Sequence, residues 1–131
     1  MKKLIVIGLC FFVLYACTDP AKRENELKNQ IIDMHEKVMN ADEALMKNKM
    51  KLDTLLQQKK DTASVKPLIA KAEAADAAME KWMSGFQPDV TGKSHDEAIT
   101  YFTGQKKEIM TVDSQINTIV KESSQYLSSH K

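Results

Sequence analysis

Apolar side chains recur along the chain at alternating spacings of four and three residues, the period of a helix that packs against other helices. In the first half of the chain the series is Leu27, Ile31, Met34, Val38, Ala41, Leu45, Asn48, Leu52 and Leu55. It runs without a slip and includes one polar residue, Asn48. The pattern predicts a helix from Pro20 to Lys59 with one buried face.

The same pattern returns twice further along the chain. A second series is Leu68, Ala72, Ala75, Met79, Trp82 and Phe86, and a third is Ala98, Phe102, Gln105, Ile109, Val112, Ile116 and Ile119. They predict helices over Val65 to Ser84 and over His95 to about Ser124. We therefore expect an all-α, heptad-patterned fold, either an antiparallel helical hairpin or a three-helix bundle with a long first helix. The polar members Asn48 and Gln105 either hydrogen-bond between helices and fix their register or lie at edge positions.

Two of the predicted helices begin with clear capping signals. Asp19 before Pro20 favours an N-cap carboxylate followed by proline in the first helical position, where the missing N–H is harmless. Ser94 and Glu97 have the spacing of a capping box. Both signals coincide with the starts that the apolar pattern predicts.

The ends of the second predicted helix are marked differently. Thr62 or Ser64 is expected to cap its start, with Pro67 in the first turn, where proline is tolerated. Gly85 is expected to end it, with Phe86 making the apolar contact that often accompanies a helix C-terminus.

The predicted helices differ in length, at about 60, 30 and 45 Å for a rise of 1.5 Å per residue. If the second helix returns only to about residue 40, the N-terminal half of the first helix keeps an open apolar face. Either the segment from Gly85 to Ser94 runs along the first helix and covers it, or another molecule does. In the second case the face is an interaction site, formed by Leu27, Ile31, Met34, His35, Val38 and Met39.

The N-terminus has the layout of an export signal, because Lys2 and Lys3 precede an apolar run from Leu4 to Leu14. A helix through residues 4–16 would be only about 20 Å long, against roughly 30 Å of bilayer hydrocarbon. The run is therefore too short for a comfortable transmembrane anchor.

The signal ends in Leu14, Tyr15, Ala16 and Cys17, which resemble the lipobox of bacterial lipoproteins, although Tyr15 is bulky for its place. The resemblance implies cleavage before Cys17 and acyl chains on that cysteine, which together form a stable membrane anchor. An ordinary secretory signal with an incidental cysteine is the alternative.

The expected organisation is a signal peptide over residues 1–16, a lipidated tether over 17–20 and one helical domain over 21–131. Of the two cysteines, Cys10 leaves with the signal and Cys17 carries lipid, so no disulfide forms within one mature chain. Removing the signal's two lysines changes the net charge from +1 to −1, with both signs interleaved. This balance gives no electrostatic footprint for nucleic acid.

No catalytic constellation is apparent in the sequence. His35 and Glu36 begin a zinc-protease motif, but the second histidine is replaced by Met39. The other histidines, His95 and His130, lie on different segments, and no Glu-x-x-His pair of a di-iron bundle is present. We therefore expect no enzymatic activity, no metal and no cofactor.

Methionine is enriched in the predicted helices, at Met34, Met39, Met46, Met50, Met79, Met83 and Met110. Soft thioethers bind Cu(I), which makes an envelope copper carrier one hypothesis. The heptad positions of Met34 and Met79 favour ordinary core packing instead.

A family resemblance rests on three short motifs: Met34-His35-Glu36-Lys37-Val38-Met39, then Lys81-Trp82-Met83 with Phe86, then Tyr101-Phe102 followed by Lys107 and Ile109. Over roughly Ile31 to Val120 the chain resembles small uncharacterised lipoproteins of the Bacteroidota that are often labelled "viral A-type inclusion protein". The resemblance implies lipidation and an envelope location. It supplies no catalytic or binding residues.

That phylum also suggests a modification and a membrane face. Asp61-Thr62-Ala63 and Asp53-Thr54-Leu55 resemble its periplasmic O-glycosylation signal, and Thr62, in a predicted loop, is the better candidate. The alternative is that Asp61 and Thr62 only cap the second helix. The residues after Cys17 lack the acidic run associated with surface export, which favours the outer membrane with the domain facing the periplasm.

The leading functional hypothesis is a membrane-tethered helical module that binds another envelope protein or a second copy of itself. The alternative is a holdase-like periplasmic chaperone, since methionine-bearing helices present pliable apolar surfaces. The copper carrier ranks third.

Overall fold

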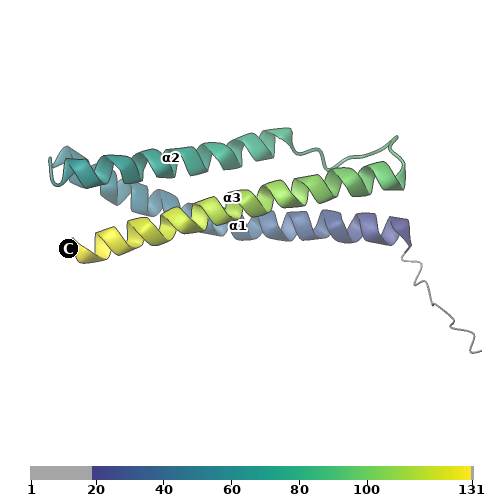
Figure 1. The fold of residues 1–131 in the computed structure, drawn as a ribbon, viewed down its shortest axis with the longest axis horizontal. Coiled ribbons are helices and arrows are strands. Elements are labelled where there is room, and N and C mark those ends of the chain that lie inside the picture. Colours follow the sequence, from purple (N-terminus) through teal and green to yellow (C-terminus); the bar gives the residue numbers. More distant parts are fainter. Residues whose placement is uncertain (1–18, 131) are drawn as a thin grey trace, which may run out of the picture.

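A computed structural model of the chain describes residues 19–130, which form three α-helices. Helix α1 spans Pro20–Gln57, α2 spans Thr62–Gly85 and α3 spans His95–Ser129. All three lie along one long axis, and α1 and α3 lie side by side (Figure 1). The expected all-α fold is confirmed as a three-helix bundle with a long first helix.

Side-chain contacts show the direction of each helix. Glu24 of α1 meets His95 at the start of α3, and Asn48 meets Ser123 near its end, so α1 and α3 run parallel. Helix α2 runs back along them, because its Glu73 pairs with Lys49 of α1, whereas Trp82, further along α2, stacks on His35, nearer the start of α1. The bundle is therefore up, down and up.

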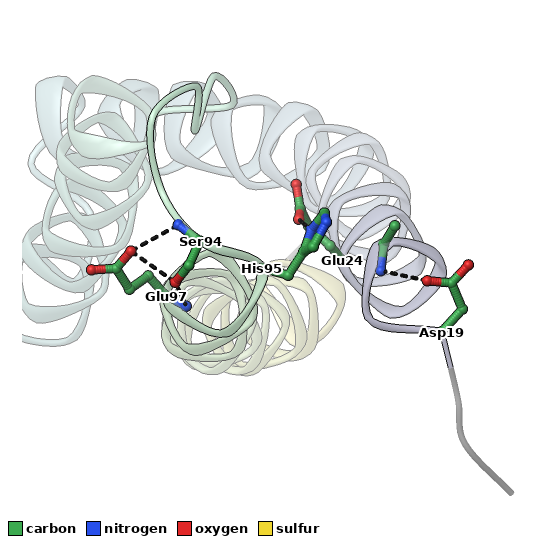
Figure 2. Close-up of polar contacts among 6 residues, drawn as sticks. Asp19, Glu24, Ser94, His95 and Glu97 are labelled. Carbon is green, nitrogen blue, oxygen red and sulfur yellow. Dashed lines mark hydrogen bonds and ion pairs between the residues drawn. The ribbon is translucent and has the colours of Figure 1, made fainter.

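The caps predicted for α1 and α3 are present (Figure 2). The Asp19 carboxylate accepts a hydrogen bond from the backbone N–H of Ala21 at 3.1 Å. At α3 the Ser94 hydroxyl accepts from the Glu97 N–H, and the Glu97 carboxylate accepts from the Ser94 N–H at 2.8 Å. These bonds satisfy backbone donors that have no partner within the helix.

The start of α2 differs from the prediction. The helix begins at Thr62, its N-cap is Asp61 in the left-handed conformation, and within the described chain the Asp61 side chain makes no capping hydrogen bond. Neither Thr62 nor Ser64 is the cap, and Pro67 lies in the second turn instead of the first. The Asp61 carboxylate instead accepts a hydrogen bond from the Tyr126 hydroxyl of α3, at 2.9 Å.

The end of α2 lies within one residue of the prediction. The helix ends at Gly85, and the N–H of Phe86 donates to the Trp82 carbonyl at 3.0 Å. The Phe86 ring stacks on the Trp82 ring with centroids 5.0 Å apart. The expected apolar contact at this helix end is thus with the preceding turn.

The core follows the predicted series on all three helices. In α1 every seventh residue is fully buried, and the intervening members are partly buried. The largest fully buried side chains are Phe102, Ile31, Leu45, Leu52, Met79, Ile109, Ile116, Val38 and Val65. Near the start of α2 the buried positions are Val65 and Ile69, while the predicted Leu68 is only partly buried.

The two polar members of the series have opposite outcomes. The Asn48 amide donates across to α3, to the Ser123 hydroxyl at 2.9 Å and the Ser124 hydroxyl at 2.8 Å, as expected for a register-fixing residue. The Gln105 amide donates to Glu108 of its own helix at 3.5 Å. Within residues 19–130 the Gln105 carbonyl oxygen is buried without a partner, so the predicted bond between helices is absent there.

Among the described residues, no helix combines the length and the apolar character needed to cross a bilayer.

Candidate interaction surface

The apolar face of the N-terminal half of α1 is covered within the chain. Ile31 and Val38 are 0% exposed, and Leu27 and Met34 pack against the same core cluster while partly buried. Of the two arrangements expected for this face, the open one is therefore not observed within residues 19–130. Ile31 and Val38 are core residues, and Leu27 and Met34 pack at the edge of the core.

The cover comes from α3 and from the segment that leads to it. After Gly85 the chain runs extended along the bundle before α3 begins at the N-terminal end of α1 (Figure 1). Within this segment the Gln87 N–H donates to the Tyr101 hydroxyl at 2.7 Å, and Val90 packs on the core. The first of the two arrangements considered above, a connecting segment that lies along the first helix, is the one observed.

The start of α3 is held beside the start of α1 by a polar contact. His95 Nδ1 lies 2.7 Å from a carboxylate oxygen of Glu24 (Figure 2). The pair would be an ion pair when His95 is protonated. From there α3 runs alongside α1 and covers its apolar face.

His35 and Met39, the other two predicted interaction residues, belong to a different surface. His35 lines a cavity of about 340 Å³, which we call the α1–α2 groove, with Ile32, Trp82, Met83, Phe86 and Pro88. Met39 lies one turn beyond His35 on the same face of α1. Ile32, Met39 and Met83 are 47%, 41% and 41% exposed, which is high for large apolar side chains.

Stacked rings form one wall of the α1–α2 groove. The His35 ring lies 5.7 Å from the Trp82 ring, at 29° to it, and Phe86 stacks on Trp82 in turn. Phe86 also faces Tyr101 of α3, with ring centroids 6.5 Å apart. This ladder joins three segments and fixes the shape of the groove.

Sequence reasoning found one residue of this groove. It chose His35, which lines the groove, and Met39, which lies one turn away, but it missed Ile32, Met83 and Pro88. Ile32 carries a usable signal, because it is a large apolar residue directly beside the heptad series. The others come from the end of α2 and the segment after it, whose path depends on the fold.

The described residues offer little chemistry beyond packing. In residues 19–130, no three His, Cys, Asp or Glu side chains converge to hold a metal ion. Met79 is buried and Met34 packs on the core, while Met39, Met50, Met83 and Met110 are exposed.

Asp42 of α1 lies near two carboxylates of α2, Asp76 and Glu80. Burial raises the pKa of Asp42 above its ordinary value of 3.8, and the carboxylates of Asp76 and Glu80 raise it further. The folded chain therefore holds this proton up to a higher pH than the unfolded chain, and stability falls as pH rises through that window. Asp42→Asn should raise the free energy of unfolding at pH 7 by up to about 0.5 kcal/mol, since screening limits the effect at this partly exposed site.

Urea unfolding of both proteins across pH would measure this difference, and the advantage of Asp42→Asn should vanish as pH falls below 3.8. Glu43→Gln is the matched control at the next residue. A hydrogen bond from Lys47 lowers the pKa of Glu43, so its neutralisation should have the opposite sign at pH 7. An Asp42→Asn effect independent of pH would contradict the electrostatic cause.

Two predicted modification sites have different outcomes. Cys17 lies outside the described residues. Thr62 is the first residue of α2 and is partly buried, so its placement in a loop is corrected. Its glycosylation stays a prediction.

No family model, no curated protein and no solved structure matches this chain.

Proposed function

We propose that this chain is a lipid-anchored envelope protein whose helical bundle binds a partner protein through the α1–α2 groove. The observation that carries the proposal is the concave apolar surface formed by Ile32, Met83, Phe86 and Pro88 around the Trp82 ring. Large apolar side chains gathered at the surface gain free energy when a partner covers them. The stacked His35 and Phe86 rings hold the site in shape, which lowers the entropy cost of binding.

The proposed anchor supports an envelope partner. Only residues 18 and 19 separate Cys17 from the start of α1 at Pro20. Ile32 lies twelve residues further on, about 18 Å along the helix axis. With acyl chains on Cys17, the groove would stay close to the membrane, within reach of other membrane-bound or periplasmic proteins.

Site-specific photo-crosslinking in cells would test the proposal. A photoreactive residue at Ile32 or Met39 should give one discrete adduct, to an envelope protein or a second copy, identified by mass spectrometry. Met50 is the matched control, because it lies on α1 and is 68% exposed but does not line the groove. An equal adduct from Met50, or none from Ile32 and Met39, would contradict the proposal.

The same experiment addresses the alternative and the anchor. A broad smear of products from Ile32 and Met39 would favour the holdase-like chaperone, whose clients are many. Cys17→Ser should release the chain from the membrane fraction and weaken the discrete adduct. Retention of Cys17→Ser in the washed membrane fraction would count against the lipid anchor.

A further inference from the structure

Two residues that line one cavity each carry a buried polar atom without a hydrogen-bond partner among the described residues. The indole Nε1–H of Trp82, which is 6% exposed, and the amide carbonyl oxygen of Gln105 are both unpaired within residues 19–130. Buried polar groups in folded proteins are nearly always paired, with protein or with ordered water. Because one atom is a donor and the other an acceptor, a group that offers both an acceptor and a donor would satisfy them.

The cavity lies between α2 and α3 and has a volume of about 330 Å³. We call it the α2–α3 cavity; it is lined by Ala78, Lys81, Trp82, Gly85, Gln105, Glu108 and Val112. A water molecule occupies about 30 Å³, so one bridging water would leave most of this space open. The volume is instead at the lower end of the range for small-ligand sites.

The lining points to a neutral ligand. Lys81 and Glu108 contribute opposite charges. Ala78 and Val112 contribute apolar side chains, and Gly85 contributes only backbone. An ion would therefore find no net attraction. A peptide group fits the two polar atoms, because its carbonyl accepts from the indole N–H and its N–H donates to the Gln105 carbonyl.

We propose that the α2–α3 cavity is a peptide-amide subsite, in which Trp82 and Gln105 bind one backbone amide of an extended partner segment. Trp82 also lines the α1–α2 groove, so a segment whose side chain fills the groove could reach the cavity across the end of α2. The inference rests on the proposed interaction role and names the chemistry that the partner offers. Both atoms are buried, so binding needs a rearrangement of the side chains around them, and the long 3.5 Å hydrogen bond from Gln105 to Glu108 leaves Gln105 free to rotate.

Nuclear magnetic resonance can follow this site without a label on the ligand. Trp82 is the single tryptophan of the chain, so the ¹⁵N-labelled full chain in detergent micelles gives one indole Nε1–H signal. N-Methylacetamide, a single peptide group, is the probe. It should shift this signal in a saturable way as the indole gains a hydrogen bond. Methyl acetate, which has the same shape but no N–H, should bind about tenfold more weakly because it cannot donate to Gln105.

Matched variants test whether the shift of the indole signal arises from binding in the α2–α3 cavity. At Gly85 and at Gly104 an added Cβ meets no described atom within 4 Å, so both positions accept a side chain. Gly85→Leu fills the cavity and should abolish the shift, whereas Gly104→Leu, outside the cavity, should leave it unchanged. Gln105→Leu keeps the indole and should erase the preference for N-methylacetamide over methyl acetate.

Each outcome of these titrations either supports the peptide-amide subsite or overturns it. The saturable shift with its loss in Gly85→Leu supports the subsite. A shift that persists in Gly85→Leu, equal affinity for both probes, or a water contact to the indole with no probe response would overturn it. Failure here with the Ile32 crosslink retained rejects the subsite alone, whereas a probe response without that crosslink rejects the proposed interaction role alone.

Discussion

Replacing Phe102 with alanine should lower the free energy of unfolding by about 3–5 kcal/mol, the usual range for a buried phenylalanine. Phe102 is 0% exposed and belongs to the main core cluster, which draws side chains from all three helices. Its ring lies 5.4 Å from Tyr101 and 6.4 Å from Phe86. The truncation therefore removes buried area and the support under the aromatic ladder of the groove. Urea unfolding followed by circular dichroism measures the loss.

Met110→Ala is the control for this prediction, because Met110 is on the same helix and is 50% exposed. Its effect should stay within about 0.5 kcal/mol, as for most surface substitutions. A Phe102→Ala loss as small as that of Met110→Ala would show that the Phe102 ring is not enclosed by the bundle.

The helices and two of their caps could be predicted from the sequence because local interactions determine them. The Asp19 cap and the Ser94–Glu97 box join residues two or three positions apart. The start of α2 could not be predicted in the same way. Asp61 adopts a left-handed conformation there, and its carboxylate is held by Tyr126, 65 positions away in the chain.

Asn48 and Gln105 show where periodicity stops being informative. Both replace an apolar residue at a heptad position, and the pattern gives no reason to separate them. Asn48 faces hydroxyls of Ser123 and Ser124 on α3. Gln105 instead lies with Trp82 in the lining of the α2–α3 cavity, and among residues 19–130 its carbonyl oxygen has no partner.

The interaction surface was the hardest part to predict. Helix lengths indicated that part of α1 needs a cover other than α2, but whether the chain supplies that cover depended on the route of nine residues, 86–94, between α2 and α3. Contacts along that route join Gln87 to Tyr101, 14 positions on, and His95 to Glu24, 71 positions back, and the second pairing depends on the fold. The groove that remains needs Met83 from α2 and Phe86 just after it beside Ile32, a neighbourhood that no single helix pattern contains.

Two adjacent isoleucines give the sharpest test of this corrected surface. Ile31→Ala should lower the free energy of unfolding by about 2–5 kcal/mol, because Ile31 is 0% exposed in the core. Ile32→Ala should change it by no more than about 0.5 kcal/mol, because Ile32 is 47% exposed. Both variants lose the same atoms, so the contrast isolates burial. Urea unfolding measures both.

The yield of the crosslinked adduct should rank the two variants the other way round, with the larger loss in Ile32→Ala. With the photoreactive residue at Met39, Ile32→Ala should remove most of the discrete adduct, since it deletes a wall of the groove without disturbing the fold. In Ile31→Ala, the fraction of chain that remains folded should crosslink normally, because Ile31 does not line the groove. If Ile31→Ala abolished the adduct in folded protein while Ile32→Ala kept it, the docking surface would be the heptad face of α1 exposed by an opening of the bundle.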